Sequence, residues 1–292
     1  MSFSLFRQKP IHVSVFGKTD TGRVRGHNED RFLVADLTQR NPTLTPEVRE
    51  HALGPKGSLL LVADGMGGAA AGEVASEMTV EVVYSYLLEA TTRALKPQRF
   101  AEDLRTSLEA ANARIHAYAA AHPEYAGMGS TATAAVIIGP DVYVAQVGDS
   151  RAYLVRQGSA VQLTEDQSLT RHLVETGQLT EAEAATAEGQ NIILQALGPA
   201  PTVNVALTRQ TLKAKDILVL CSDGLSGLVD APEIAQVVAS SEDPSINCED
   251  LVALANSRGG RDNITVVVAR LDGGGLKEPR EGDPSARPQT MP

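Results

Sequence analysis

The sequence is poor in the residues that mark several classes of protein. It contains no tryptophan, only 4% aromatic residues and two cysteines among 292 residues. With so few aromatic rings, small and branched aliphatic side chains must fill the core. The two cysteines, Cys221 and Cys248, indicate neither a disulfide framework nor a cysteine-based metal site. Cys221 lies inside an apolar run, where we interpret it as a small core residue.

An excess of basic residues and long apolar runs are also absent. The formal net charge is -10, and a surface of this sign repels polyanions, so we expect no nucleic acid partner. No stretch approaches the roughly 18 consecutive apolar residues of a membrane helix. Residues 1–10 lack the apolar run of a signal peptide. We therefore expect a cytoplasmic protein with no membrane partner, and we take it to be a monomer.

The pattern of apolar runs and turn residues predicts both strands and helices. Strands are expected over residues 11–19, 31–36, 58–63, 131–138, 141–147, 151–155, 191–194, 203–207, 216–221 and 264–271. Helices are expected over residues 69–90, 97–121, 168–176, 180–187, 232–240 and 248–257. Strands come in runs and helices in pairs, which favours antiparallel sheets covered by helical hairpins.

The same pattern divides the chain into three parts. We expect residues 1–10 to be a loose N-terminal segment and residues 11–271 to form the folded domain. Within that domain, the prolines and glycines of residues 38–57 mark a surface loop. From Asp272 onward the sequence is rich in glycine, proline and charge, so residues 272–292 are predicted to be a disordered tail.

Two segments share one design: an apolar run, then Asp-Gly, then a flexible turn. They are residues 59–68 and 217–227, which place Asp64 and Asp223 at the ends of buried strands. Further carboxylates, on Glu29, Asp30 and Asp262, lie beside similar strand candidates. Carboxylates that converge from distant parts of a chain suit hard divalent cations. Two alternatives to a metal site are open. Each Asp-Gly could be an ordinary turn, and Glu29 and Asp30 could be a solvated pair of surface carboxylates.

Six short motifs, taken together, resemble the bacterial form of the PPM (type 2C) metal-dependent protein phosphatases. They occur in the order of that family over residues 11–271 and read Thr19-Asp20-Thr21-Gly22 through Arg25-Gly26-His27-Asn28-Glu29-Asp30, Ala63-Asp64-Gly65-Met66-Gly67-Gly68, Gly129-Ser130-Thr131-Ala132, Val147-Gly148-Asp149-Ser150-Arg151, Ser222-Asp223-Gly224 and Gly260-Arg261-Asp262-Asn263. The resemblance implies an α+β fold: a four-layer αββα sandwich, with two central antiparallel β-sheets flanked by helical pairs. It also implies a flap over residues 166–196.

The resemblance assigns metal ligands residue by residue. Asp64 matches the aspartate that bridges two Mn²⁺ or Mg²⁺ ions, and Gly65 matches the glycine whose carbonyl binds one of them. Asp223 and Asp262 match the ligands of the other ion. Asp149 matches the ligand of a third ion that many bacterial members hold, although a Gly-Asp-Ser turn would also explain this residue.

Three further residues complete the implied site. Glu29 and Asp30 match carboxylates that hold metal-coordinated waters. Arg25 lies five residues before Asp30, as does the phosphate-binding arginine of the family, and its guanidinium can fork two phosphate oxygens. The implied catalytic residues are therefore Arg25 and Asp30, beside the metals.

The implied reaction is hydrolysis of phosphoserine and phosphothreonine in proteins by a hydroxide that bridges two metal ions. Such an enzyme would oppose a bacterial Ser/Thr kinase and act on its substrates. Two alternatives stay open: a catalytically silent sensor or interaction module of the same fold, and a dedicated phosphatase of one regulatory partner. The chain departs from common family patterns at Met66, Gln167 and Gln195. With Met66 in place of a histidine, a metal-bound water would have to protonate the leaving group. The two glutamines, in or near the flap, affect substrate recognition more than metal chemistry.

Overall fold

The computed structural model describes residues 9–43, 50–68, 70–90, 97–184, 187, 189, 192–280 and 288–291. Within these residues the strands form two sheets in which all pairs are antiparallel. The six-stranded sheet has the order β10-β9-β12-β13-β1-β4. Its strands are, in that order, Ser159–Gln162, Arg151–Arg156, Ile217–Cys221, Ile264–Asp272, His12–Asp20 and Glu50–Ala52.

The eight-stranded sheet has the order β14-β11-β8-β7-β5-β2-β3, and β6 pairs with the end of β5. The strands of this order are Gln289–Thr290, Ala206–Thr211, Asp141–Val147, Ala132–Ile138, Ser58–Met66, Asp30–Asp36 and Asn41–Thr43, and β6 is Gly129–Ser130.

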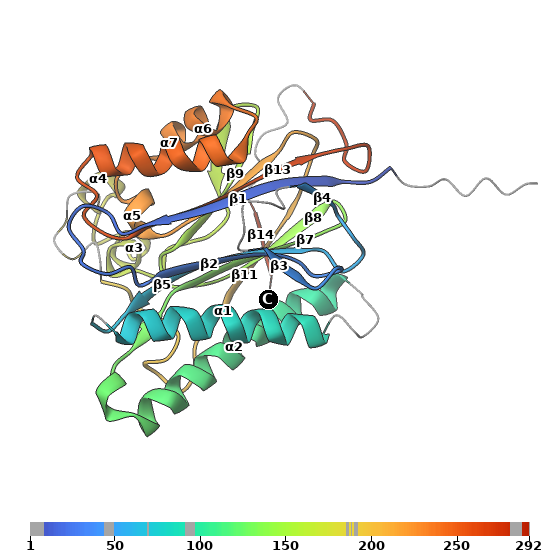
Figure 1. The fold of residues 1–292 in the computed structure, drawn as a ribbon. Coiled ribbons are helices and arrows are strands. Elements are labelled where there is room, and N and C mark those ends of the chain that lie inside the picture. Colours follow the sequence, from blue (N-terminus) through green and yellow to red (C-terminus); the bar gives the residue numbers. More distant parts are fainter. Residues whose placement is uncertain are drawn as a thin grey trace, which may run out of the picture.

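A pair of long helices covers the outer face of each sheet, as Figure 1 shows. Helices α1 (Ala71–Ala90) and α2 (Pro97–Ala121) pack on the larger sheet, and α6 (Ala231–Ser240) and α7 (Pro244–Ser257) pack on the smaller one. Shorter helices lie in the connections: η1 (Pro123–Tyr125), α3 (Leu169–Glu175), α4 (Glu181–Ala184) and α5 (Asp223–Ser226). Of the described helices, not one combines the length and hydrophobicity that a bilayer span requires.

The core explains why strand β5 carries a continuous apolar run. In β5, Leu59 and Leu61 pack in the layer under α1 and α2, whereas Leu60 and Val62 pack in the layer between the two sheets. Because β5 is buried on both faces, its positions from Leu59 to Ala63 are all apolar, up to Asp64 at the open end of the sandwich. The four-layer αββα prediction is therefore confirmed.

The structure differs from the predicted elements mainly at the sheet edges. The short strands β3 and β4 lie within residues 38–57, which we expected to be a loop, and β10 was also not expected. Strands of three or four residues leave no periodic signal to read. Helix α7 begins at Pro244 rather than at residue 248, because Asp243 caps it and accepts a bond from the Ser245 amide at 2.8 Å.

The C-terminal segment is not without structure where it is described. Residues 289–290 form β14 on the edge of β11, and the Met291 amide donates to the Leu207 carbonyl at 2.9 Å. Leu276 is buried in the layer between the sheets. The prediction of a disordered tail from residue 272 is therefore wrong for residues 272–280 and 288–291, since an open strand edge offers unpaired backbone groups. Residues 281–287, and residues 1–8 of the expected loose N-terminal segment, lie outside the described residues.

Candidate metal centre

Strand pairing places the first two carboxylates. Asp30 and Asp64 are opposite each other in the register of β2 and β5, at the end where both strands leave the core. Thr131 fixes the Asp64 peptide on the other side: its Oγ1 accepts from the Asp64 amide at 3.1 Å, and its amide donates to the Asp64 carbonyl at 2.8 Å. Asp64 is therefore held from both edges of β5, by its pairing with β2 and by Thr131.

Packing alone requires glycine at position 65, whether or not its carbonyl binds a metal ion. A Cβ at residue 65 would collide with the carbonyl oxygen of Gly72 on α1 and would lie 2.7 Å from the carbonyl oxygen of Glu29. The Gly65 amide donates to that Glu29 carbonyl at 3.2 Å. Only glycine lets α1, β5 and the loop before β2 meet here.

Asp223 and Asp262 come from the other sheet. Strand β12 ends at Cys221, and Asp223 opens the single-turn helix α5 directly after it. Asp262 immediately precedes Asn263 and β13, and its Oδ1 accepts from the Asn263 amide at 2.8 Å. The two central strands of the smaller sheet, which pair with each other, thus deliver these carboxylates to the same end of the sandwich.

Asn263 is a functional residue whose role the sequence did not reveal. Its Nδ2 donates to the carbonyls of Thr21 and His27 at 3.0 and 2.8 Å, and its Oδ1 accepts from the Glu29 amide at 2.8 Å. One buried side chain therefore fastens the loop between β1 and β2 to the start of β13. The sequence shows that Asn263 follows Asp262 in its motif. It does not show the hydrogen-bond partners of Asn263, which are more than 230 residues away in the chain.

These residues surround a pocket of about 420 Å³. Five carboxylates line it, those of Glu29, Asp64, Asp149, Asp223 and Asp262. The rest of the lining includes Arg25, His27, Met66, Thr131 and Ile193. Asp30 lies behind the wall, 1% exposed, and its Oδ2 accepts from Ser222 Oγ at 2.7 Å. The structure thus brings every predicted metal ligand into one pocket, and it places Asp30 beneath them.

Arg25 is the cation that faces these carboxylates. Its Nη2 donates to Asp262 Oδ2 at 2.7 Å, and both side chains remain partly exposed. The guanidinium therefore lies at the mouth of the pocket, where it can reach an incoming anion.

The pocket holds more carboxylates than Arg25, which pairs with Asp262, can neutralise. Burial, followed by repulsion from Asp30, Asp223, Asp149 and Asp262, raises the pKa of Asp64 well above its ordinary value. Burial likewise raises the pKa of Asp30 and of Asp149 to about 7, and repulsion from Asp223 adds to both shifts. Groups of this kind need a positive partner to stay ionised at neutral pH.

Unpartnered oxygens support the same conclusion. Asp30 Oδ1 and Asp223 Oδ1 are buried and have no hydrogen-bond partner among the described residues. No group of three or more His, Cys, Asp and Glu side chains in the described ranges is arranged to hold an ion alone. Small hard cations do not need three such side chains, because they bind through one or two carboxylates and keep water or carbonyl oxygens as their other ligands. Paired carboxylates beside the Gly65 backbone fit that requirement.

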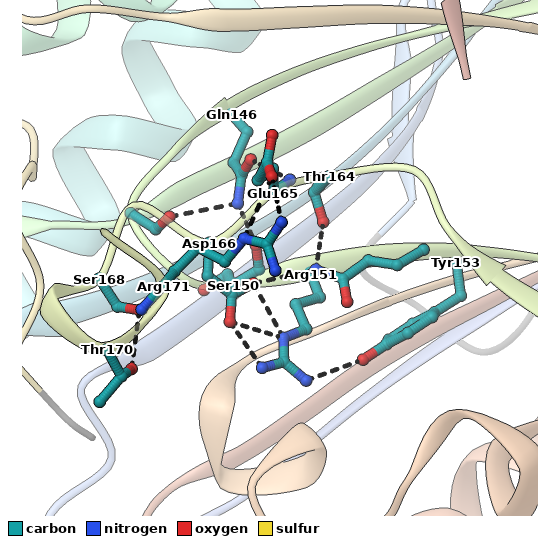
Figure 2. Close-up of polar contacts among 12 residues, drawn as sticks. Gln146, Ser150, Arg151, Tyr153, Thr164, Glu165, Asp166, Ser168, Thr170 and Arg171 are labelled. Atoms are coloured by element: carbon teal, nitrogen blue, oxygen red, sulfur yellow. Dashed lines mark hydrogen bonds and ion pairs between the residues drawn. The ribbon is translucent and has the colours of Figure 1, made fainter. Parts of the chain in front are cut away.

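A second pocket, of about 920 Å³, opens beside the first and shares Asp149 and Asp223 with it. Figure 2 shows the polar network on its wall. Arg151 donates to both oxygens of Asp166 at 2.6 to 3.0 Å and to the Tyr153 hydroxyl at 3.2 Å. Arg171 donates to Glu165 at 2.7 Å. These ion pairs anchor the base of the predicted flap, part of which lies outside the described residues.

The two glutamines that depart from the family pattern hold the same base. Gln167 Oε1 accepts from the Gly148 amide at 2.9 Å, and its Nε2 donates to the Asn204 carbonyl at 3.1 Å. Gln195 Oε1 accepts from the Asn204 amide at 2.8 Å. The amide and the carbonyl of Asn204 are thus both hydrogen-bonded to glutamine side chains. Because Gln167 also binds the Gly148 amide, it holds the base of the flap beside the Gly148–Asp149 turn.

Two antiparallel sheets, flanked by helical pairs and open at one end onto a pocket of carboxylates, define a class of metal-dependent hydrolases. Comparison with known proteins makes the class specific. A family model described as protein phosphatase 2C matches residues 49–257. The serine/threonine phosphatase stp of Listeria monocytogenes is 36% identical over 87% of this chain and 94% of its own length. This chain belongs to the protein phosphatase 2C family.

Solved structures agree with this assignment. The serine/threonine phosphatase of S. agalactiae has a TM-score of 0.78 and 36% identity, covering 88% of this chain and 98% of its own. The catalytic domain of the serine/threonine protein phosphatase PstP, solved in complex with two manganese ions, has a TM-score of 0.73 and 32% identity. That match covers 90% of this chain and 99% of the PstP chain.

Proposed function

We propose that this chain removes phosphate from phosphoserine and phosphothreonine in proteins with two divalent cations held by Asp64, Gly65, Asp223 and Asp262. Membership in the 2C family makes it a metal-dependent serine/threonine protein phosphatase. The observation that carries the site assignment is that five carboxylates from separate segments of both sheets line one pocket, more than Arg25, which pairs with Asp262, can neutralise. The manganese ions of the PstP structure support Mn²⁺ as a cofactor, and Mg²⁺ has the same ligand preference.

The residues divide into ligands and positioning groups. Asp64 and the Gly65 carbonyl would hold one cation, and Asp64, Asp223 and Asp262 the other. Asp149 extends the set toward a third. When bound, such ions lower the pKa of a water molecule and neutralise phosphate charge.

The remaining groups bind and orient the substrate and water. Arg25, at the pocket mouth, can leave Asp262 and fork two phosphate oxygens. Glu29 lines the pocket and Asp30 supports it from beneath, so both can accept hydrogen bonds from ordered water. Met66 also lines the pocket but carries no proton to donate. With methionine at this position, we propose that water would donate the proton to the leaving oxygen of the serine or threonine.

We also propose partners and setting. The phosphoproteins are products of a serine/threonine kinase, and the enzyme acts on them as a monomer in the cytoplasm. Two buried free cysteines fit a reducing compartment. The net charge of -10 argues against nucleic acid as a partner.

The test compares a phosphothreonine peptide with a phosphotyrosine peptide of the same sequence. We expect hydrolysis of the first in Mn²⁺, its loss in EDTA and its return when Mn²⁺ is restored. No EDTA-sensitive hydrolysis of either peptide would contradict the proposal and favour a silent module of the same fold.

A further inference from the structure

The C-terminal strand β14 lies on the edge of the larger sheet and forms part of the wall of the second pocket. Thr290 pairs with Thr208, and Gln289 pairs with Arg209 of β11. Both Pro288 and Thr290 line the pocket of about 920 Å³ that opens beside the carboxylates. The end of the chain thus reaches the neighbourhood of the candidate metal centre.

The register of the sheet shows which way Thr290 points. Residues directly opposite one another on neighbouring antiparallel strands have their side chains on the same face of the sheet. Thr290 is opposite Thr208, and Thr208 is opposite Val144 on β8. All three line the second pocket, and Thr208 Oγ1 donates to the carbonyl of Leu163, which also lines it, at 2.9 Å. The side chain of Thr290 therefore faces this pocket.

The other face of β14 packs on the core, because successive residues of a strand point to opposite faces. Met291 packs against the hydrophobic cluster under α1 and α2, to which Tyr143 belongs. Gln289 is opposite Arg209, whose guanidinium lies 5.9 Å from the centre of the Tyr143 ring. The strand is thus anchored through its helix-facing side, which leaves Thr290 on the pocket side.

The second pocket adjoins the first at two of the proposed metal ligands, since Asp149 and Asp223 line both. The volume of about 920 Å³ is near the upper end of the roughly 300–1,000 Å³ typical of ligand sites, and it exceeds what one phosphoryl group fills. A phosphorylated residue in the first pocket carries polypeptide on both sides, and each extended residue advances about 3.3 Å. Adjacent residues of the substrate can therefore enter the second pocket.

We infer that Pro288 and Thr290 contact the part of the substrate polypeptide that adjoins the phosphorylated serine or threonine, so that β14 helps to determine specificity. This inference rests on the proposed function. The row of side chains that continues from β14 across the sheet, Thr290, Thr208 and Val144, is uncharged. The contacts that this wall offers are therefore van der Waals contacts and hydrogen bonds, which salt does not screen.

The experiment uses the full-length protein in Mn²⁺ with two substrates. One is a phosphothreonine peptide with about three residues on each side, which spans about 20 Å when extended. The other is p-nitrophenyl phosphate, which has no flanking residues. Thr290→Tyr and Pro288→Tyr place a ring in the pocket wall. Gln289→Tyr is the matched control, because it adds the same ring to the opposite face of the same strand.

The measured quantity is the ratio of kcat/KM for the peptide to kcat/KM for p-nitrophenyl phosphate. We expect this ratio to fall about five-fold in Thr290→Tyr and in Pro288→Tyr, through a higher KM for the peptide, because the ring occupies space that the peptide would fill. In Gln289→Tyr the ratio should stay within about two-fold of its value in the unaltered protein. The fall should be the same at low and high salt.

Three results would overturn this role of β14. The first is an unchanged or higher ratio in either pocket-facing variant. The second is an equal fall in Gln289→Tyr, which would show a general effect on the strand. The third is a fall that comes from kcat alone, which would show that β14 acts on the metal centre and not on the polypeptide.

The same measurements separate this inference from the proposed function. Failure of the unaltered protein to hydrolyse p-nitrophenyl phosphate in Mn²⁺ would count against the proposed function itself. Hydrolysis of both substrates, with the ratio unchanged in the variants, would count against the role of β14 alone.

Discussion

The carboxylate pocket and the flap beside it are built in contrasting ways. Each pocket carboxylate lies in a strand or within two residues of a strand end, so the buried core sets its position. The flap base is held by ion pairs and glutamine side chains near the surface, such as Arg171 on Glu165 and Gln195 on Asn204. Contacts of that kind contribute little stability each, and the segments they hold open more readily. The proposed metal ligands thus lie on the rigid part, and the flap base beside them is the more adjustable part.

The largest effect should come from removing the carboxylate shared by both cations. Asp64→Asn is expected to lower metal-dependent kcat/KM on a phosphothreonine peptide by at least about 10³-fold, since it removes a ligand of both ions. The fold should survive, because the substitution relieves repulsion within the pocket. Steady-state kinetics and thermal unfolding in EDTA check both statements. Asp243→Asn is the control, because Asp243 is an exposed helix cap and its substitution should not change activity.

Arg25→Lys should have the next largest effect. Lysine keeps the charge but loses the planar fork, so we expect kcat/KM to fall by about 10²-fold. The neighbouring Arg23→Lys, in the same exposed loop, is the matched control and should stay within two-fold. Unchanged activity in Arg25→Lys would show that positive charge, and not a directed guanidinium, serves the reaction. An equal loss in Arg23→Lys would contradict a specific role for Arg25.

The buried carboxylates at the pocket should give the free energy of unfolding a pH dependence of its own. Folding raises the pKa of Asp30 and of Asp149 to about 7. The native state therefore binds more protons than the unfolded chain between about pH 4 and 7. Without cations, the free energy of unfolding should fall across this window by up to about 1.4 kcal/mol per pH unit for each group.

Thermal unfolding from pH 5 to pH 8, in EDTA and in Mn²⁺, measures this dependence. Bound cations keep the carboxylates ionised, so Mn²⁺ should flatten or reverse the slope. Asp30→Asn should flatten it in EDTA. A metal-free protein that becomes more stable as the pH rises through this window would contradict the charge balance described for the pocket.

The smallest effect is expected at the flap base. Asp166→Asn weakens the forked pair with Arg151, and we expect KM for a phosphopeptide to rise about three- to ten-fold. Hydrogen exchange of residues 164–175 should become faster. Glu175→Gln removes a more exposed ion pair of the same segment and should change neither measurement. Loss of Mn²⁺ binding in Asp166→Asn would mean that pocket and flap are not separate units.

The same contrast decides what the sequence could predict. Asp64 and Asp223 were predictable because a strand buried on both faces leaves an unbroken apolar run, and each Asp follows such a run. The long helices were also predictable, and α2 has the expected bounds. The edge strands β3, β4, β10 and β14 were missed, since each spans only two to four residues.

Side chains that join distant segments could not be predicted from local pattern. Asn263 bonds the loop around Glu29, and Ser222 bonds Asp30, across separations of 234 and 192 residues. Asp30 was expected to hold metal-coordinated water, and the fold places it beneath the pocket because β2 enters the core at that residue. Gln167 and Gln195 were interpreted only as departures from a pattern, and their hydrogen bonds to Asn204 emerge in three dimensions.

The most direct test is an anomalous scattering map of crystals grown with Mn²⁺. We predict two manganese peaks in the pocket, with the Asp64 carboxylate bonded to both, the Gly65 carbonyl to one, and Asp223 and Asp262 to the other. Manganese absent from this pocket, or bound at it without Asp64, would contradict the central claim that the strand ends of both sheets together form a two-cation site.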